Sequence, residues 1–135
     1  MTDEHRRILA EGQHLFSQLC IRDVDVPDVE LAIEMDLTPR VANPSGALQG
    51  GLIATMADIV AGRLAIVGLD PGWTVATTDL AVHYLGPVNA GPARAEGTIL
   101  KRGRSSIVVH VEVRDVGRNR LAAVSIVTFA VVGPR

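Results

Sequence analysis

The chain has 135 residues, of which 47% are hydrophobic, 21% are charged and only 3% are aromatic, and its formal net charge is −2. This length is enough for one domain with a substantial core, and the apolar content excludes a disordered chain. The few aromatic residues disfavour base stacking, so no nucleic-acid partner is expected.

Several absences narrow the class of protein further. Cys20 is the single cysteine, which rules out an intrachain disulfide and favours a reducing compartment, the cytoplasm. The polar start, residues 1–7, lacks the apolar stretch of a secretory signal. Asp58 and Arg63 interrupt the longest apolar run, so no membrane span is expected. The four histidines show no metal-ligand spacing, and we expect neither a metal nor another cofactor.

We expect a single domain over residues 1–135, made of an N-terminal helix within 1–22 and a core from about 25 to 133. The helix is predicted from an amphipathic pattern at helical spacing. In chain order, the pattern then predicts a break at 23–27, a half-buried alternating strand at 29–37, and a loop at 39–49 that holds two prolines.

A long helix is predicted over residues 50–67, which are apolar on nearly all sides, as is typical of a buried helix. After a turn at 70–72, four further strands are predicted at 73–85, 93–102, 104–116 and 120–132. The last strand is apolar on both faces and is expected to lie inside the sheet. The result is an α+β fold, in which an antiparallel sheet with meander-like later strands covers one long central helix.

Asp58 is the one acidic residue of this central helix. Burying an ionised carboxylate without a partner is strongly unfavourable. Asp58 is therefore either paired for structural reasons or placed in a cleft where it does chemistry. Arg63 lies five positions further along, which is not an ion-pair spacing on a helix.

Gly50 and Gly51 open the same helix. A helix N-terminus presents free backbone N–H groups and the positive end of the helix dipole, and glycine lets a ligand carbonyl come close, as an oxyanion hole requires. The alternative is that the glycines serve backbone conformation alone. Asp58 lies eight residues beyond Gly50, about 12 Å along the axis. Both groups can reach one reacting centre only if two helices run antiparallel across a two-fold axis, which requires at least a dimer.

Four segments of the chain resemble one known family. They are Asn43–Asp58, whose spacing through Gly50 is the most specific, and the more generic Thr77–Pro87, Gly103–Ser105 and Val127–Phe129. Over about residues 25–133 the chain resembles the hotdog-fold acyl-CoA thioesterases, in particular the phenylacetate-degradation and hydroxybenzoyl-CoA thioesterase branch. The resemblance implies a hotdog fold, with a five- to six-stranded sheet around the helix. It also implies hydrolysis of an acyl-CoA thioester, in which CoA is part of the substrate.

The resemblance also implies roles for individual residues. The Gly50 N–H would polarise the thioester carbonyl, and Asp58 of the other subunit would act as nucleophile or as general base for water. Asn43 would help to hold the carbonyl or the water. The family commonly carries histidine before the two glycines, whereas this chain has Gln49, which can orient a ligand by hydrogen bonds but does not titrate near neutral pH.

A second departure from the family is Ala76, where some relatives carry a hydroxyl residue near the attacking water. Thr77 or Thr78 is the candidate replacement, depending on the register of the strand. Gly51, next to Gly50, is a further candidate contact to the substrate.

The C-terminal part of the chain is basic. Residues 93–135 carry 8 Lys/Arg and 3 Asp/Glu, whereas residues 1–92 carry 5 and 12. The centre of this region is a compact basic turn, made of Lys101, Arg102, Gly103, Arg104 and Ser105. The resemblance places this turn near the CoA nucleotide, whose phosphates need cations; the alternative is a solvated turn.

We expect an enzyme that forms a homodimer or a homotetramer. Two alternatives stay open. Hotdog hydratases carry histidine five residues after the aspartate, a position that Arg63 occupies here, which argues against that reaction. A non-catalytic acyl-CoA-binding module would use the same pocket, but such a module gains nothing from Asp58 beside a thioester and phosphates.

Overall fold

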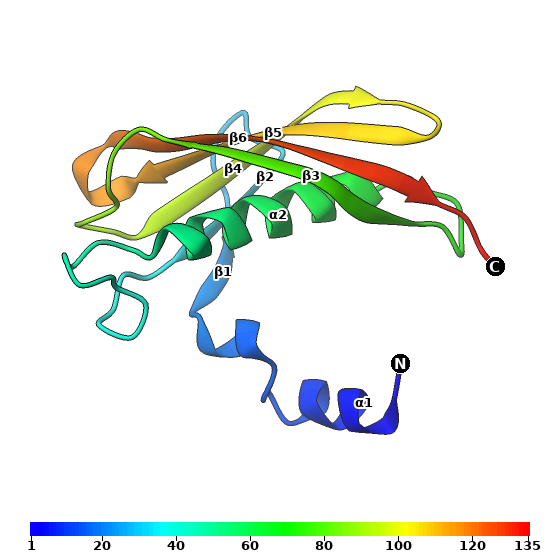
Figure 1. The fold of residues 1–135 in the computed structure, drawn as a ribbon, viewed down its shortest axis with the longest axis horizontal. Coiled ribbons are helices and arrows are strands. Elements are labelled where there is room, and N and C mark those ends of the chain that lie inside the picture. Colours follow the sequence, from blue (N-terminus) through cyan, green and yellow to red (C-terminus); the bar gives the residue numbers. More distant parts are fainter.

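The computed structural model describes residues 1–135 and shows a curved antiparallel sheet laid over one side of a long helix (Figure 1). The helices are α1 (Asp3–Ala10) and α2 (Gly50–Ile66), with short 3-10 helices η1 (Leu15–Gln18) and η2 (Val116–Arg118). The strands are β1 (Ile21–Val24), β2 (Leu31–Met35), β3 (Thr74–Tyr84), β4 (Ala93–Arg102), β5 (Ser106–Asp115) and β6 (Arg120–Val132). The predicted α+β hotdog architecture is confirmed. Neither helix has the length and apolarity that a bilayer crossing would require.

The six strands follow the spatial order β1-β2-β4-β5-β6-β3, and every neighbouring pair is antiparallel. The predicted meander is therefore wrong for β3, which does not lie beside β4 but pairs with β6 at the end of the sheet. The physical reason lies in β6, which is apolar on both faces and has β5 on one edge and β3 on the other. The prediction that β6 lies inside the sheet is confirmed.

Strand β1 falls partly within the predicted break at 23–27. Its four residues pair with β2, from Ile21 opposite Met35 to Val24 opposite Ala32. A strand this short has no room for a visible alternation, and β1 is defined by its partner rather than by its own pattern. An ion pair of 2.9 Å between Arg22 and Glu34 ties it to β2.

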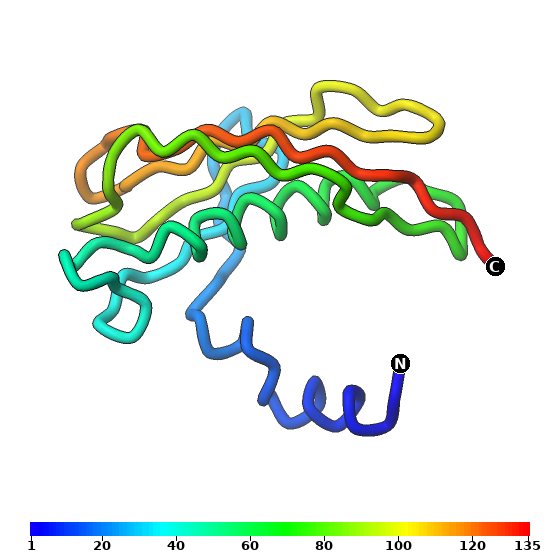
Figure 2. Tube along the Cα trace, in the orientation of Figure 1, coloured from blue at the N-terminus to red at the C-terminus, as the bar shows by residue number.

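The N-terminal helix is shorter than predicted. It ends at Ala10, and Gly12 follows with a positive φ of 66°, a conformation that cannot continue a helix. The His14 Nδ1 atom then accepts a hydrogen bond from the Phe16 N–H and starts η1. No residue of α1 is buried, and this segment lies apart from the sheet and from α2 (Figure 2).

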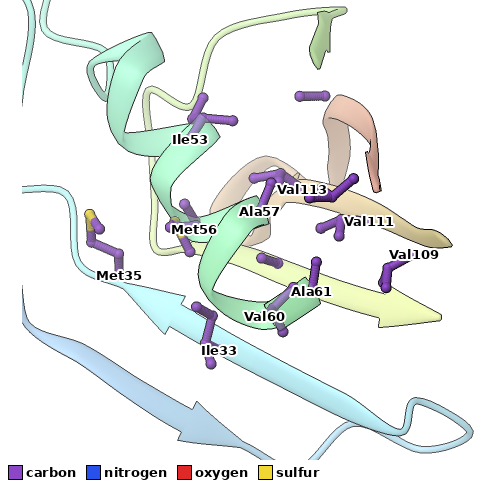
Figure 3. Close-up of a cluster of buried hydrophobic side chains, with 14 of the residues drawn as sticks. Ile33, Met35, Ile53, Met56, Ala57, Val60, Ala61, Val109, Val111 and Val113 are labelled. Atoms are coloured by element: carbon purple, nitrogen blue, oxygen red, sulfur yellow. The ribbon is translucent and has the colours of Figure 1, made fainter. Parts of the chain in front are cut away.

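The core lies between α2 and the concave face of the sheet (Figure 3). Met56, Ala57 and Val60 of α2 are fully buried against strand residues such as Ile33 and Val111. A Cβ atom on Gly97 of β4 would come within 2.6 Å of the Leu64 side chain, so glycine here lets α2 lie close to the sheet. The sheet covers one side of α2 only and leaves the rest partly open, and Asp58 lies at the margin of the covered side, beside β3.

Candidate active site

The N-terminus of α2 presents two unpaired backbone donors. Gln49 is the N-cap, and its carbonyl accepts the N–H groups of Leu52 and Ile53 at 3.0 and 3.3 Å. The N–H groups of Gly50 and Gly51 have no acceptor within the chain. These two N–H groups lie at the positive end of the helix dipole and are available to an oxygen atom that carries negative charge.

The fold itself does not require glycine at either position. Neither residue has a positive φ. A Cβ atom on Gly50 would meet the Tyr84 ring at an ordinary contact distance of 3.5 Å, and one on Gly51 would meet nothing within 4 Å. Glycine in a helix interior costs up to about 1 kcal/mol relative to alanine. Conformation and packing therefore do not explain the glycine pair, and open space lies in front of Gly51.

Asp58 has no cationic partner. Its side chain is half-buried, and its Oδ1 atom accepts one hydrogen bond, of 2.8 Å, from the Thr77 hydroxyl. Arg63 turns away and donates two hydrogen bonds of 2.7 Å to the carboxylate of Asp23 in β1, which hold the pKa of Asp23 below its usual range. Of the two explanations for Asp58, structural pairing with a cation is thereby excluded within the protomer.

Asp58 lines an open cleft of about 400 Å³ between α2 and β3, here called the Asp58 cleft. Thr77 lies beside Asp58, and the rest of the lining is largely apolar. The remaining lining residues are Ile59, Gly62, Arg63, Ile66, Thr74, Val75 and Phe129. The cleft thus joins one carboxylate to an apolar surface.

A second hollow of about 320 Å³, here called the Gly50 pocket, lies at the other end of the helix. It is lined by Asn43, Ala47, Leu48, Gly50, Ile53, Tyr84, Leu85, Gly86 and Pro87. Gly50 and Asp58 are separated by about 12 Å along α2, so one protomer does not bring them together.

Strand β3 has a bulge between Thr77 and Asp79. Thr77 points to Asp58, whereas the Thr78 hydroxyl donates to the Thr128 carbonyl at 3.1 Å and so belongs to the sheet. Ala76 is exposed. Of the two candidate threonines, only Thr77 binds Asp58.

Asn43 closes the loop that leads into α2. Its Oδ1 atom accepts the N–H groups of Ser45 and Ala47 at 2.9 and 3.1 Å, while its Nδ2 atom has no partner in the chain. The side chain of Gln49 is exposed and forms no capping bond. The amide nitrogen of Asn43, which lines the Gly50 pocket, and the whole side-chain amide of Gln49, which is exposed beside Gly50, therefore have no partner in the chain.

The predicted basic turn divides into two kinds of residue. Arg102 donates to the carbonyls of Ala65 and Leu64 at 2.9 and 3.0 Å, which caps the C-terminus of α2. Lys101 and Arg104 are exposed and form no ion pair with this chain. Gly103 is required by the turn, because a Cβ atom there would lie 2.8 Å from the Ser106 carbonyl.

Ser105 contributes its backbone to the sheet, since its carbonyl accepts the Val131 N–H at 2.9 Å. Ser105 therefore has a structural role, as Arg102 and Gly103 do, and the fold requires these three residues whether or not a ligand binds. The cations of the turn that remain free for an anionic ligand are Lys101 and Arg104.

Two residues near the Gly50 pocket are not among the site residues predicted from the sequence. Tyr84 donates its hydroxyl to the Gly50 carbonyl at 2.6 Å. Asp115 is fully buried and accepts the N–H groups of Asn89, Ala90 and Gly91 at 2.9, 3.1 and 2.8 Å. A signal for Asp115 existed, because the alternation of buried valines in β5 reaches its position two residues after Val113.

The contacts of Asp115 explain its charge state. Burial opposes its ionisation, but the backbone N–H groups that surround the carboxylate outweigh burial and hold its pKa below the usual range. The loop that Asp115 anchors includes Val88, whose carbonyl accepts the Leu48 N–H at 2.9 Å. Asp115 thus supports one wall of the Gly50 pocket from behind.

The chain is similar to known proteins in both sequence and fold. Residues 45–122 match the family model described as "Thioesterase superfamily". A Haemophilus influenzae protein named "Putative esterase" is 30% identical over 98 residues, which are 73% of this chain and 70% of the relative. A protein of the same name from Saccharolobus solfataricus is 27% identical over 108 residues, 80% of this chain and 76% of the relative.

Two solved structures share the fold. The crystal structure of a thioesterase from Haemophilus influenzae superposes with a TM-score of 0.82 at 26% identity, covering 98% of this chain and 92% of that one. A Bacillus halodurans protein, whose crystal structure contains CoA, superposes with a TM-score of 0.81 at 24% identity, covering 100% of this chain and 97% of that one.

Proposed function

This chain belongs to the thioesterase superfamily, and on that premise we propose that it hydrolyses an acyl-CoA thioester to a free acid and CoA. The observation that carries the proposal is Asp58, a half-buried carboxylate in an apolar cleft that no cation neutralises and only Thr77 binds. Such a carboxylate is free to accept a proton or to attack a carbonyl carbon.

In the general-base form of the reaction, the Asp58 carboxylate removes a proton from water while the water oxygen attacks the thioester carbonyl carbon. The carbonyl oxygen becomes an oxyanion, which the N–H groups of Gly50 and Gly51 stabilise. The C–S bond then breaks, the acid leaves, and the CoA thiolate takes up the proton. In the nucleophilic form, the Asp58 carboxylate attacks the carbonyl carbon itself, and the C–S bond breaks to release the CoA thiolate. Water then hydrolyses the resulting anhydride to the free acid and the Asp58 carboxylate, and its proton goes to the thiolate.

Hydrolysis in either form needs Asp58 and Gly50 at one centre. Because they lie about 12 Å apart on one helix, we assign each site to two subunits, with their α2 helices antiparallel. The open edge of β3 supports this assembly, since the strand ends the sheet and almost all of its residues are exposed. Exposed Trp73 and Leu80 add apolar surface at the same edge.

Two surfaces support an acyl-CoA substrate. The Asp58 cleft continues into Ile59, Val75 and Phe129, an apolar surface suited to an acyl group. The free cations Lys101 and Arg104 suit the phosphates of the nucleotide. A protein of the same fold, from Bacillus halodurans, contains CoA in its crystal structure.

The test is thiol release from a panel of acyl-CoA substrates by the wild type and by Asp58→Asn. The variant should lose about 10²–10⁴-fold in kcat while it still binds substrate. Asp70→Asn makes the same change at an exposed carboxylate in the turn before β3; this control variant should turn over normally. Equal turnover of Asp58→Asn and the wild type would refute the assignment of Asp58.

The same panel separates the two alternatives. A binding module would bind acyl-CoA without releasing thiol even as the wild type. A hydratase would consume an enoyl thioester without cleaving it. Hotdog hydratases carry a histidine where this chain has Arg63, and the Arg63 side chain is bound to the carboxylate of Asp23.

A further inference from the structure

We infer that Tyr84 is a positioning residue of this hydrolysis: its hydroxyl holds the peptide between Gly50 and Gly51 and makes the Gly51 N–H a stronger donor to the oxyanion. This inference rests on the proposed function, and it gives Tyr84, which lies within the segment Thr77–Pro87 that resembles the family, a role that the resemblance does not assign.

The contact itself is direct. The Tyr84 hydroxyl donates to the Gly50 carbonyl at 2.6 Å, and its ring lies beside Gly50, 3.5 Å from where a Cβ atom would be. Tyr84 is 53% exposed, so its hydroxyl could be satisfied by water without this bond. A hydrogen bond in such a setting adds little to folding stability, so its main effect falls on the helix terminus that it touches.

The Gly50 carbonyl and the Gly51 N–H belong to the same peptide group. A donor at the carbonyl oxygen withdraws electron density from the peptide and strengthens its N–H as a donor, the cooperativity of linked hydrogen bonds. The Gly51 N–H has no acceptor in the chain, and the space in front of Gly51 is open. The effect of Tyr84 therefore falls on a donor that is free to bind substrate.

The geometry of β3 makes this contact possible. Thr77 and Tyr84 are seven residues apart, an odd number, so in a regular strand they would point to opposite faces of the sheet. The bulge at Thr78 adds one residue to β3, and Thr77 and Tyr84 pair with Phe129 and Ala123, which are six residues apart on β6. Both side chains thereby face α2, one at Asp58 and the other at Gly50.

The first experiment compares steady-state kinetics of the wild type, Tyr84→Phe and Ser125→Ala. Tyr84→Phe keeps the ring and removes the hydroxyl; we expect kcat to fall about tenfold, less than the loss of a direct oxyanion donor, with KM unchanged. Ser125→Ala is the matched control, because it removes another hydroxyl that binds a backbone carbonyl, that of Ala81 at 2.8 Å, away from the two pockets. It should keep the wild-type kcat.

The second experiment does not depend on turnover. In a ¹H–¹⁵N correlation spectrum, the Gly51 amide proton should move upfield in Tyr84→Phe and stay in place in Ser125→Ala, because only the first change removes the bond to the Gly50 carbonyl.

The outcomes are distinct. A wild-type kcat, a change confined to KM, or an unmoved Gly51 amide in Tyr84→Phe would overturn the role of Tyr84. Failure of the wild type to cleave any thioester, or full activity of Asp58→Asn, would instead overturn the proposed function. Loss of kcat together with a moved Gly51 amide supports the inference.

Discussion

At the scale of single residues, the helix α2 begins with two glycines, Gly50 and Gly51, although its backbone conformation does not require glycine at either position. Both adopt ordinary negative-φ geometry, and both have room for a methyl group. Their effect is to leave the first N–H groups of the helix uncovered. The residue before them, Gln49, adds a free amide at the same point but no titrating group.

Gly51→Ala separates folding from function. Alanine is the better helix former, so the free energy of unfolding should stay the same or rise by up to about 1 kcal/mol. The added methyl group enters the space that the proposal gives to the thioester, so kcat/KM should fall. Urea denaturation and thiol release on the same preparation test both parts. A variant that is stable and fully active would mean that no ligand approaches Gly51.

Gln49→His tests the meaning of the missing histidine. Imidazole titrates near 6.5, so the variant should gain a limb near neutral pH in its kcat/KM profile, whereas the wild-type profile should be flat there. The variant should remain active if position 49 only orients the substrate. Loss of activity in a folded variant would show instead that the amide of Gln49 binds the thioester directly.

At the scale of elements, the hairpin between β4 and β5 combines a helix cap with two free cations. Arg102 satisfies the last carbonyls of α2, while Arg104 points to no partner in the chain. Two arginines that are two residues apart thus have different expected effects when they are replaced.

Arg102→Ala should lower the free energy of unfolding by about 1 kcal/mol, because the α2 terminus loses its cap. Arg104→Ala should leave stability unchanged and raise KM for acyl-CoA roughly tenfold at constant kcat. The KM effect should vanish for acyl-pantetheine substrates, which lack the nucleotide phosphates. An equal KM effect on both substrate types would place Arg104 away from the nucleotide.

The loop between β3 and β4 depends on Asp115. Asp115→Asn should lower the free energy of unfolding by about 2 kcal/mol at pH 7, because buried N–H groups lose a charged acceptor. The folded pKa of Asp115 lies below its unfolded value of about 3.9, so the stability it contributes is present above that pH and is lost as the pH falls further. The difference between wild type and variant should therefore shrink between pH 4 and the acid limit, as urea titrations at several pH values would measure. A difference in the free energy of unfolding that stays constant with pH would contradict the lowered pKa of Asp115 in the folded protein.

At the scale of the whole molecule, each active site is expected to draw on two subunits. Forming mixed dimers from two inactive variants tests whether the site is shared between subunits. Asp58→Asn keeps a working helix N-terminus and Gly51→Val keeps a working carboxylate, so each homodimer should be inactive. Refolding the two together should restore about a quarter of wild-type turnover, since half of the dimers then hold one intact site. No recovery, or an active monomer in sedimentation, would exclude the shared site.

Much of this fold was accessible from the sequence, because α2 and β6 carry long, one-sided or fully apolar patterns. The position of β3 in the sheet could not be predicted from the sequence. Strand β3 pairs with β6, which lies about 50 residues away along the chain, and no local sequence pattern indicates that pairing. Asp58 and Gly50 could be singled out by their chemistry. Tyr84 could not, because the face on which it lies depends on the bulge at Thr78, and one extra residue reverses any alternation read along the chain.

That bulge also bears on which changes the protein can accept over evolutionary time. Inserting a residue between positions 78 and 83 would add to the extra residue already there and turn either Thr77 or Tyr84 to the far side of the sheet, whereas deleting one residue would leave the two six positions apart and on the same face. A substitution in the same stretch would leave both in place. This stretch of β3 should therefore accept the loss of one residue but not the gain of one, and variation among descendants of this chain should accumulate in it as replacements and single deletions and not as insertions.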